Sequence, residues 1–214
     1  MSQTVIENPV INSPYLEPTK HFRFTDEGIT NVIVSGRRVS SYFIPIPQPK
    51  QKTKQMTITE SEWVGDRVEE NTFINQIRDR VTIWRDNRWP GTTEVTRKLL
   101  RYWVSSEREK PLFFCQIEAL ETAIYLTEVA EKQGDSWILE QLKSANNEVN
   151  PGLWRIAFKM ATGTGKTVVM AMILTWQTLT KIQNPRDSRF SDPFLIVPPG
   201  TTIRDRLRVL YPHD

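Results

Sequence analysis

Residues 160–167 place two glycines, a lysine and a threonine at the spacing that a phosphate-binding loop requires. Gly163 and Gly165 permit the positive φ angles and the close backbone approach that let several N–H groups converge on phosphate oxygens. Lys166 is placed to reach the β- and γ-phosphates of a nucleotide, and the Thr167 hydroxyl is placed to ligate Mg²⁺. We therefore predict that ATP and Mg²⁺ are bound by the following residues: Ala161, Thr162, Gly163, Thr164, Gly165, Lys166 and Thr167.

The segments on either side of this loop follow the order of a βαβ unit. Leu153–Phe158 is a short apolar strand candidate, and Phe194–Val197 is a second one. Val168–Leu179, between them, is apolar nearly all round, as expected of a helix buried against a sheet. This order predicts a parallel sheet of the α/β class, with the loop at a helix N-terminus, where the helix dipole favours anions. The competing interpretation is a glycine turn that happens to precede a core helix.

The N-terminal part of the chain has a different character. Residues 1–60 are expected to form a β-rich leader, because the extended runs Asn31–Val34 and Ser41–Ile44 are broken by glycine and proline. Pro45–Gln55 is polar, basic and proline-bearing, which is typical of a linker. We assign no chemistry to this leader.

Residues 61–150 are predicted to be helical, and residues 151–214 to be the first part of the phosphate-loop domain. Apolar residues recur at helical spacing in three places. Thr92 or Thr93 is expected to cap the second of these helices, and the third follows Pro111. The expected buried stripes are Ile74, Ile77, Val81 and Trp84; then Val95, Leu99 and Trp103; then Ile117, Leu120 and Ile124.

The composition is that of an ordinary globular protein, with 38% of the 214 residues apolar and 25% charged. The formal net charge of +3 fits an anionic partner and fits a plain surface equally well. No apolar run approaches the roughly 18 residues of a membrane-spanning helix, and no signal-peptide pattern opens the chain. The single cysteine, Cys115, and two distant histidines leave no disulfide or Cys/His zinc site within the chain. We therefore expect a cytoplasmic protein that does not enter a membrane.

The loop and three further stretches resemble parts of known helicases. Residues 160–167 read Met-Ala-Thr-Gly-Thr-Gly-Lys-Thr and resemble Ala-x-x-Gly-x-Gly-Lys-Thr, the form that superfamily 2 helicases use, with Met160 at the position where the general phosphate-loop pattern has its first glycine. Gln116 resembles the glutamine of their Q-type motif, and Phe194–Leu207 resembles motif Ia in the form found in restriction-type helicase subunits. Residues 14–22 and 37–47 are similar to the leader of type III restriction enzyme helicase subunits, which are also described as DEAD/DEAH-type helicases.

This resemblance implies a nucleotide site and a nucleic-acid site. The Gln116 amide would read the adenine edge, and Phe113 or Phe114 would stack on the base. Two plainer interpretations stay open: Gln116 as a solvent-facing residue of an amphipathic helix, and Thr201 or Thr202 as a helix N-cap. In motif Ia, backbone N–H and hydroxyl groups meet nucleic-acid phosphates, and the matching residues here are Pro199, Gly200, Thr201, Thr202 and Arg204.

As a whole, the resemblance implies the ATP-binding N-terminal part of a DNA-directed superfamily 2 helicase or translocase with a RecA-like domain. The resemblance implies DNA as the partner, and a modification or specificity subunit as a further candidate partner. Hydrolysis of ATP also needs an acidic Asp-Glu pair and an arginine finger. No Asp-Glu-x-His, Asp-Glu-Ala-Asp or Ser-Ala-Thr string and no nuclease carboxylate set occurs in this sequence. We therefore expect a truncated chain without catalytic residues, and whether it is an enzyme by itself stays open.

Two other classes of protein remain in play. One is a non-catalytic module that holds a nucleotide or DNA. The other is a fragment of an RNA helicase, which shares the phosphate loop but is disfavoured by the restriction-type motif Ia and leader. In similar P-loop ATPases the two strand candidates are not sheet neighbours, because strands from later in the sequence lie between them. We therefore expect residues 153–200 to be partly molten, and the chain to be poorly soluble, when it is expressed alone.

Overall fold

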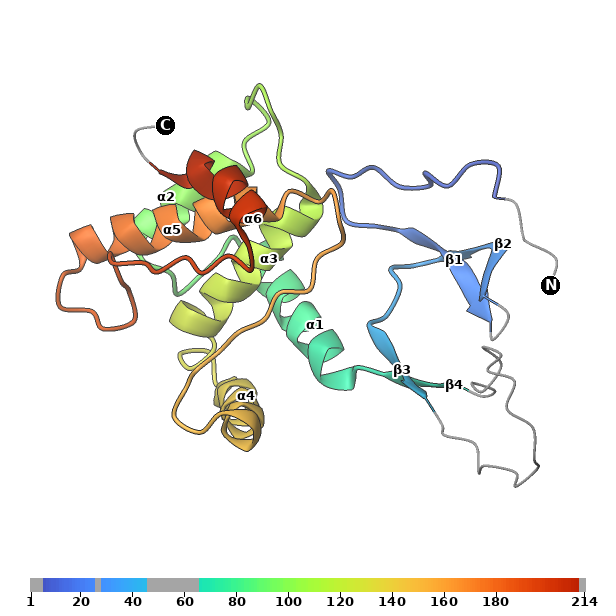
Figure 1. Cartoon of the computed structure of the whole chain (residues 1–214), viewed down its shortest axis with the longest axis horizontal. Coiled ribbons are helices and arrows are strands. Elements are labelled where there is room, and N and C mark those ends of the chain that lie inside the picture. The colour runs from blue at the N-terminus through green and yellow to red at the C-terminus, as the bar shows by residue number, and fades with distance from the viewer. Residues whose placement is uncertain (1–5, 26–27, 46–65, 212–214) are drawn as a thin grey trace. The chain divides into compact units, whose positions relative to one another are not determined.

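The computed structural model describes residues 6–25, 28–45 and 66–211. The chain divides into two compact units, Met1–Gln76 and Ile77–Asp214. The first unit holds all of the strands found in the described residues, and most of the helical residues belong to the second (Figure 1). The predicted three-part division of the chain, with boundaries near residues 60 and 150, stays a prediction.

The first unit contains two antiparallel strand pairs: three of the strands lie within residues 1–60, which were expected to be β-rich, whereas the fourth lies in the segment that was expected to be helical. Strand β1 (Lys20–Thr25) pairs with β2 (Gly28–Ser35), so that Lys20 lies opposite Ser35, and the register shifts between Phe22 and Phe24. Strand β3 (Ser41–Pro45) pairs with β4 (Asp66–Glu70). The two predicted extended runs lie in β2 and β3. Apart from Pro45, the predicted linker Pro45–Gln55 lies outside the described residues.

Side-chain amides secure the ends of these strands. Asn12 Oδ1 accepts hydrogen bonds from the N–H groups of Thr19 and Lys20, where β1 begins. Asn75 Oδ1 accepts from the N–H of Ser40 at 2.8 Å, and Asn75 Nδ2 donates back to the Ser40 carbonyl. Small two-stranded sheets bury little apolar surface, so bonds of this kind matter for their stability.

The second unit is helical, and its helices begin and end where local signals place them. Three of the four residues in the predicted stripe on the first helix, Ile77, Val81 and Trp84, are buried, and Ile74 is half-buried. Thr93 is the N-cap of the second helix, with its Oγ1 accepting from the Thr96 N–H at 3.2 Å. The helical elements are α1 (Thr72–Asp86), α2 (Glu94–Trp103), α3 (Phe114–Ile124), η1 (Tyr125–Val129), α4 (Ser136–Val149), α5 (Lys166–Gln183), α6 (Thr201–Arg206) and η2 (Leu207–Leu210).

Helix α3 runs directly into η1, a π-helical turn. The N–H of Ala130 donates to the carbonyl of Tyr125 at 2.8 Å, which is a five-residue step in place of the usual four. Tyr125 is fully buried, and its ring packs edge-to-face on Trp84 at a centroid distance of 5.4 Å. The continuous helix from α3 to η1 therefore forms the centre of the core, with Leu120, Ile124 and Val129 also buried in it.

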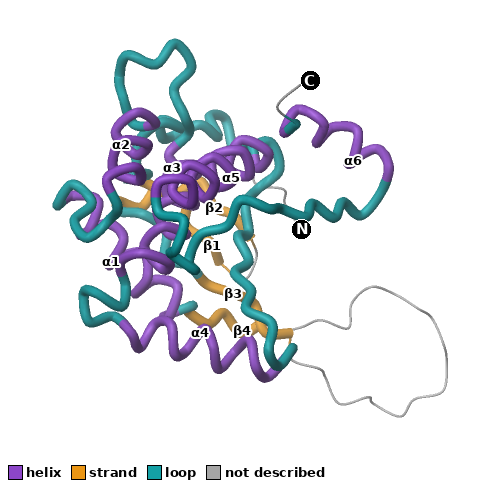
Figure 2. Tube along the Cα trace, turned by 90° about the vertical axis from the view of Figure 1, so that its left-hand side faces the viewer, coloured by secondary structure: helices purple, strands orange, loops and turns teal. Residues whose placement is uncertain are grey.

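Helix α5 lies against α3 and α2 (Figures 1 and 2). Its buried residues recur on one face only, which is not what we predicted for a helix apolar nearly all round. The other face is exposed, and it carries Val168, Leu179 and Ile182. The prediction of burial against a sheet is thus wrong for this helix, since its described neighbours are helices. The buried residues are Val169, Met172, Trp176 and Thr180.

Two other predictions about this region are also wrong. Leu153–Phe158 and Phe194–Val197 are not strands, and both are drawn as loops in Figure 2. A strand needs a neighbour to receive its N–H and C=O groups, and residues 71–211 supply no strand to pair with either segment. The predicted βαβ unit is therefore not formed within the described part of the chain. Leu195 and Val197 are 89% and 79% exposed as a result.

These unpaired segments should be visible in hydrogen exchange. We expect the amides of Leu195–Val197 to exchange at nearly the rate of an unstructured peptide, whereas amides in α3 should be slowed by about a thousandfold or more. Mass spectrometry of peptides from the exchanged chain measures both. Protection of residues 195–197 equal to that of α3 would mean that this segment is paired after all. Fewer residues are therefore expected to be disordered than the range 153–200 predicted from the sequence, because α5 lies within that range and packs against α3 and α2.

Candidate phosphate-binding site

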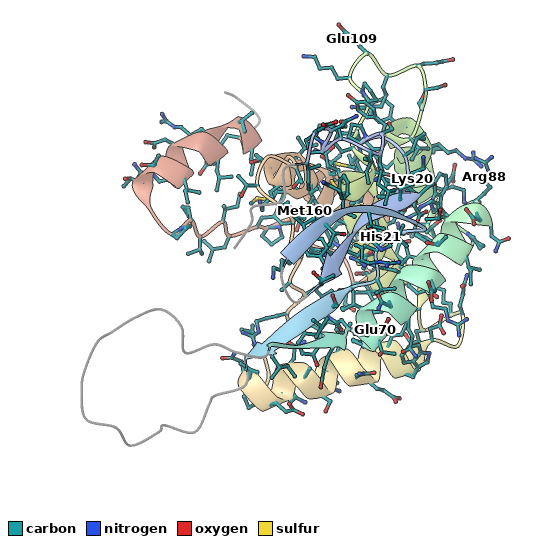
Figure 3. The ribbon with its side chains drawn as sticks, turned by 90° about the vertical axis from the view of Figure 1, so that its right-hand side faces the viewer. Lys20, His21, Glu70, Arg88, Glu109 and Met160 are labelled. Atoms are coloured by element: carbon teal, nitrogen blue, oxygen red, sulfur yellow. The ribbon has the colours of Figure 1, made fainter. Side chains whose placement is uncertain are left out.

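The predicted phosphate loop leads directly into α5, with Met160 at its start (Figure 3). Gly163 and Gly165 have φ angles of 82° and 73°, in the left-handed region that glycine adopts without strain. The carbonyl of Ala161 accepts two hydrogen bonds from within the loop, from Thr164 Oγ1 at 2.7 Å and from Lys166 Nζ at 2.8 Å. The lysine ammonium thus lies folded over its own loop.

The loop also presents backbone donors at the start of a long helix. Gly165 is the N-cap of α5, and Lys166 and Thr167 begin its first turn. In the part of the chain that the structure describes, no hydrogen bond is formed by the N–H groups of these three residues. Free N–H groups at a helix N-terminus, with a lysine beside them, are suited to a phosphate chain. Thr167 is half-buried at the same turn, where its hydroxyl would reach a Mg²⁺ ion held by that phosphate chain.

Gln116 reaches this loop from α3. Its side chain is buried, with Oε1 accepting from the Phe113 N–H and Nε2 donating to the Thr164 carbonyl, both at 2.9 Å. The interpretation of Gln116 as a solvent-facing residue is therefore wrong. The structure brings the predicted adenine-reading residue to the phosphate loop, but contact with a base is still a prediction.

The two aromatic residues predicted to stack on the base lie at the start of α3. Phe113 is the N-cap of this helix and Phe114 is its first residue, and both are half-buried. The Arg85 guanidinium lies 5.0 Å from the centroid of the Phe114 ring. A base stacked on that face of Phe114 would have to share it with Arg85, so stacking also stays a prediction.

The residues of the predicted motif Ia lie at and just before α6. Helix α6 begins at Thr201 with Gly200 as its N-cap, so neither Thr201 nor Thr202 is the N-cap. Pro199 precedes this turn and is exposed, as is the side chain of Arg204, whose Nε lies 3.5 Å from Asp205 Oδ1. Among the described residues, no hydrogen bond joins this segment to the phosphate loop. The structure therefore does not unite the two predicted sites.

Sequence reasoning missed a buried acidic residue that holds α5 in place. Glu128, in η1, accepts from the Thr93 N–H at 2.7 Å and from the Trp176 indole Nε1 at 2.9 Å, and it also accepts from the Thr96 hydroxyl. Trp176 is in the middle of α5, so these bonds tie the loop-bearing helix to α2 and η1. The burial of Glu128 could have been predicted from the sequence, because Glu128 follows Ile124 by four residues and so continues the buried stripe of α3.

A second buried carboxylate lies in α3. Glu121 accepts from Arg85 Nε at 2.7 Å and from Trp89 Nε1 at 2.8 Å. Burial raises the pKa of the Glu121 carboxyl above its usual range, and the Arg85 charge opposes this shift. Trp89 has a φ of 58°, unusual for a residue with a side chain, so the turn after α1 is shaped to deliver its indole to Glu121.

Together these contacts define a lysine-bearing loop at the N-terminus of α5. Buried Gln116 bonds to the loop itself, and buried Glu128 bonds to the helix that follows it. Residues 109–211 match the family model of the type III restriction enzyme, res subunit. We call residues 109–211 the res-subunit segment. The resemblance predicted from the sequence is confirmed over this segment.

The res-subunit segment runs from just before α3 to the end of η2, and it contains every predicted site residue. The match indicates an ATP-dependent domain of the helicase family. Comparisons with curated proteins and with solved structures gave no match. Within the described residues, no three His, Cys, Asp or Glu side chains cluster in a way that would hold a metal ion by themselves. No described helix is long and apolar enough to span a membrane.

Proposed function

We propose that this chain binds the triphosphate of ATP together with Mg²⁺ at residues 161–167. The observation that carries the proposal is the set of N–H groups at the start of α5 that form no hydrogen bond within the described residues, with Lys166 Nζ bonded to a loop carbonyl. Lys166 would exchange the Ala161 carbonyl for a phosphate oxygen, and the Thr167 hydroxyl would face the metal. A bound phosphate chain would then satisfy donors that the protein alone leaves open.

We further propose that the res-subunit segment belongs to a RecA-like motor that acts on DNA. The family match supports this, and so does the exposed Gly200–Thr202 turn with Arg204 beside it, which suits contacts to a nucleic-acid backbone. Adenine recognition by Gln116, with Phe113 or Phe114 against the base, is a separate hypothesis from the sequence, and the nucleotide titrations described below test it. No residue of this chain is assigned a role in the hydrolysis step.

Replacing Lys166 by alanine is expected to weaken binding of MgATP by about tenfold to a hundredfold, because a charge-assisted bond to phosphate is lost. Isothermal titration of the 214-residue chain measures the dissociation constant. Lys159→Ala is the matched control, because Lys159 is an exposed lysine just before the loop. Its binding constant should not change. Equal binding by wild type and Lys166→Ala would reject the phosphate-loop assignment.

A module that binds nucleotide without turning it over is a second candidate. Release of inorganic phosphate from ATP, measured in the presence of DNA, tests this second candidate. Turnover by the wild type that is abolished in Lys166→Ala would exclude the non-catalytic module.

A further inference from the structure

The side-chain amide of Gln116 is engaged at both ends. One end caps the first turn of α3 through the Phe113 N–H, and the other donates to the carbonyl of Thr164, 48 residues later in the chain. The residue is only 5% exposed. This amide therefore connects the central helix of the core to the middle of the phosphate loop.

The loop is shaped around this amide at its second glycine. A Cβ placed on Gly165 would lie 2.2 Å from Gln116 Nε2, which is closer than a side chain can come. The same atom placed on Gly163 would meet nothing, although both residues have positive φ. A side chain at position 165 would therefore displace the Gln116 amide, in addition to straining the backbone at this residue.

The bond from Gln116 to the Thr164 carbonyl also sets the direction of the next N–H group, because both groups belong to one peptide unit. The Thr164 carbonyl and the Gly165 N–H belong to one planar trans peptide, so they point in opposite directions. When Gln116 Nε2 holds that carbonyl towards α3, the Gly165 N–H must point away from α3. That N–H is one of the donors left open at the start of α5.

We propose that Gln116 is a positioning residue for the phosphate loop and acts independently of the base. It fixes the Thr164–Gly165 peptide, and this aims the Gly165 N–H at the phosphate chain of any nucleoside triphosphate. The inference rests on the proposed phosphate site. It differs from the adenine contact predicted from the sequence, because an adenine contact would favour ATP over other nucleotides whereas loop positioning would not.

The test uses the whole chain with Gln116→Met, which keeps the length of the side chain and removes both hydrogen bonds, and with Gln116→Asn, which falls short of the Thr164 carbonyl. Titrations with ATP, GTP and inorganic tripolyphosphate, each with Mg²⁺, give three dissociation constants for each variant. All three are expected to rise by the same factor, about tenfold. The matched control is Gln177→Met, which removes the bond from the Ser191 N–H to Gln177 on α5 and should leave all three constants unchanged.

Each outcome decides a different point. A loss confined to ATP would show that Gln116 reads the base and would overturn the proposal, as would three unchanged constants. If the wild-type chain binds neither ATP nor tripolyphosphate, the phosphate site itself fails and this inference falls with it. A second readout needs no ligand: the ¹⁵N–¹H signal of Gly165 should move in both Gln116 variants and stay in place in Gln177→Met. An unmoved Gly165 signal would also overturn the proposal.

Discussion

Replacing Trp176 by alanine is expected to lower the free energy of unfolding of the second unit by about 4 kcal/mol. Trp176 is 2% exposed, its indole packs edge-to-face on Phe190 at 5.9 Å, and its Nε1 donates to Glu128 at 2.9 Å. The substitution therefore leaves a cavity and removes a donor from a buried carboxylate. Urea unfolding followed by the helical circular dichroism signal measures the loss, since the helices report mainly on the second unit.

The loss of stability should also affect the phosphate loop, because Trp176 holds α5 in place and the loop leads into the N-terminus of α5. We expect weaker binding of MgATP by Trp176→Ala at temperatures where the helical signal is still intact. Trp154→Ala is the matched control: Trp154 is 49% exposed, so the effect on stability should stay within about 0.5 kcal/mol. Equal losses for the two tryptophans would contradict the packing of α5 described above.

Replacing Glu121 by glutamine is expected to destabilise the second unit by about 3 kcal/mol, because the largely buried Arg85 cation then loses the carboxylate that lies 2.7 Å from its Nε. The Glu121 side chain is fully buried and that of Arg85 is 16% exposed, with 2.7 Å between Nε and Oε2. Removing the cation as well should recover much of the loss. The double variant Arg85→Met, Glu121→Gln is therefore expected to be more stable than Glu121→Gln alone, as measured by urea unfolding of the wild type, the two single variants and the double variant.

Glu118→Gln serves as the control for this pair. Glu118 lies on the same face of α3 as Glu121 but at a longer distance from Arg85, 3.9 Å between Oε1 and Nη2. Its replacement should cost clearly less than that of Glu121. Strict additivity of the Arg85 and Glu121 substitutions would show that the two charges do not depend on each other.

Local patterns sufficed where neighbouring residues decide the structure. The glycines of the phosphate loop, the cap at Thr93 and the buried stripe of α1 all follow from residues within a few positions of one another. The family resemblance likewise came from contiguous strings, and the match over residues 109–211 confirms it. These features need no knowledge of tertiary contacts.

Features that depend on distant parts of the chain were missed or misjudged. A strand exists only when another strand pairs with it, so the apolar character of Phe194–Val197 could not by itself settle its structure. Charged residues are rarely buried, which is why Glu121 and Glu128 were not expected in the core. Both nevertheless continue the stripe of Ile117 and Ile124, at steps of three and four residues, and this spacing was the available signal.

In the candidate site, too, the features set by neighbouring residues could be predicted and those set by distant residues could not. The loop itself could be predicted because its chemistry lies in eight consecutive residues. The bond from Gln116 to Thr164 could not, since a glutamine in a helix has many possible partners and the sequence does not say which one it meets. Helix α4 (Ser136–Val149) lies in the segment predicted to be helical, but no buried stripe was predicted for it, because its buried face is narrow and centres on Ile138.

The π-helical turn η1 is the place where the continuous helix from α3 to η1 can lose one residue without losing its packing. A π turn contains one residue more than a regular α-helix needs at the same place. Loss of one residue within Tyr125–Val129 would leave an ordinary α-helix, with the side chains before and after it still facing the core. The same deletion elsewhere in α3 would rotate the remainder of the helix by about 100° and carry its buried side chains to the surface. Relatives of this chain that differ in length along this helix are therefore expected to differ at η1.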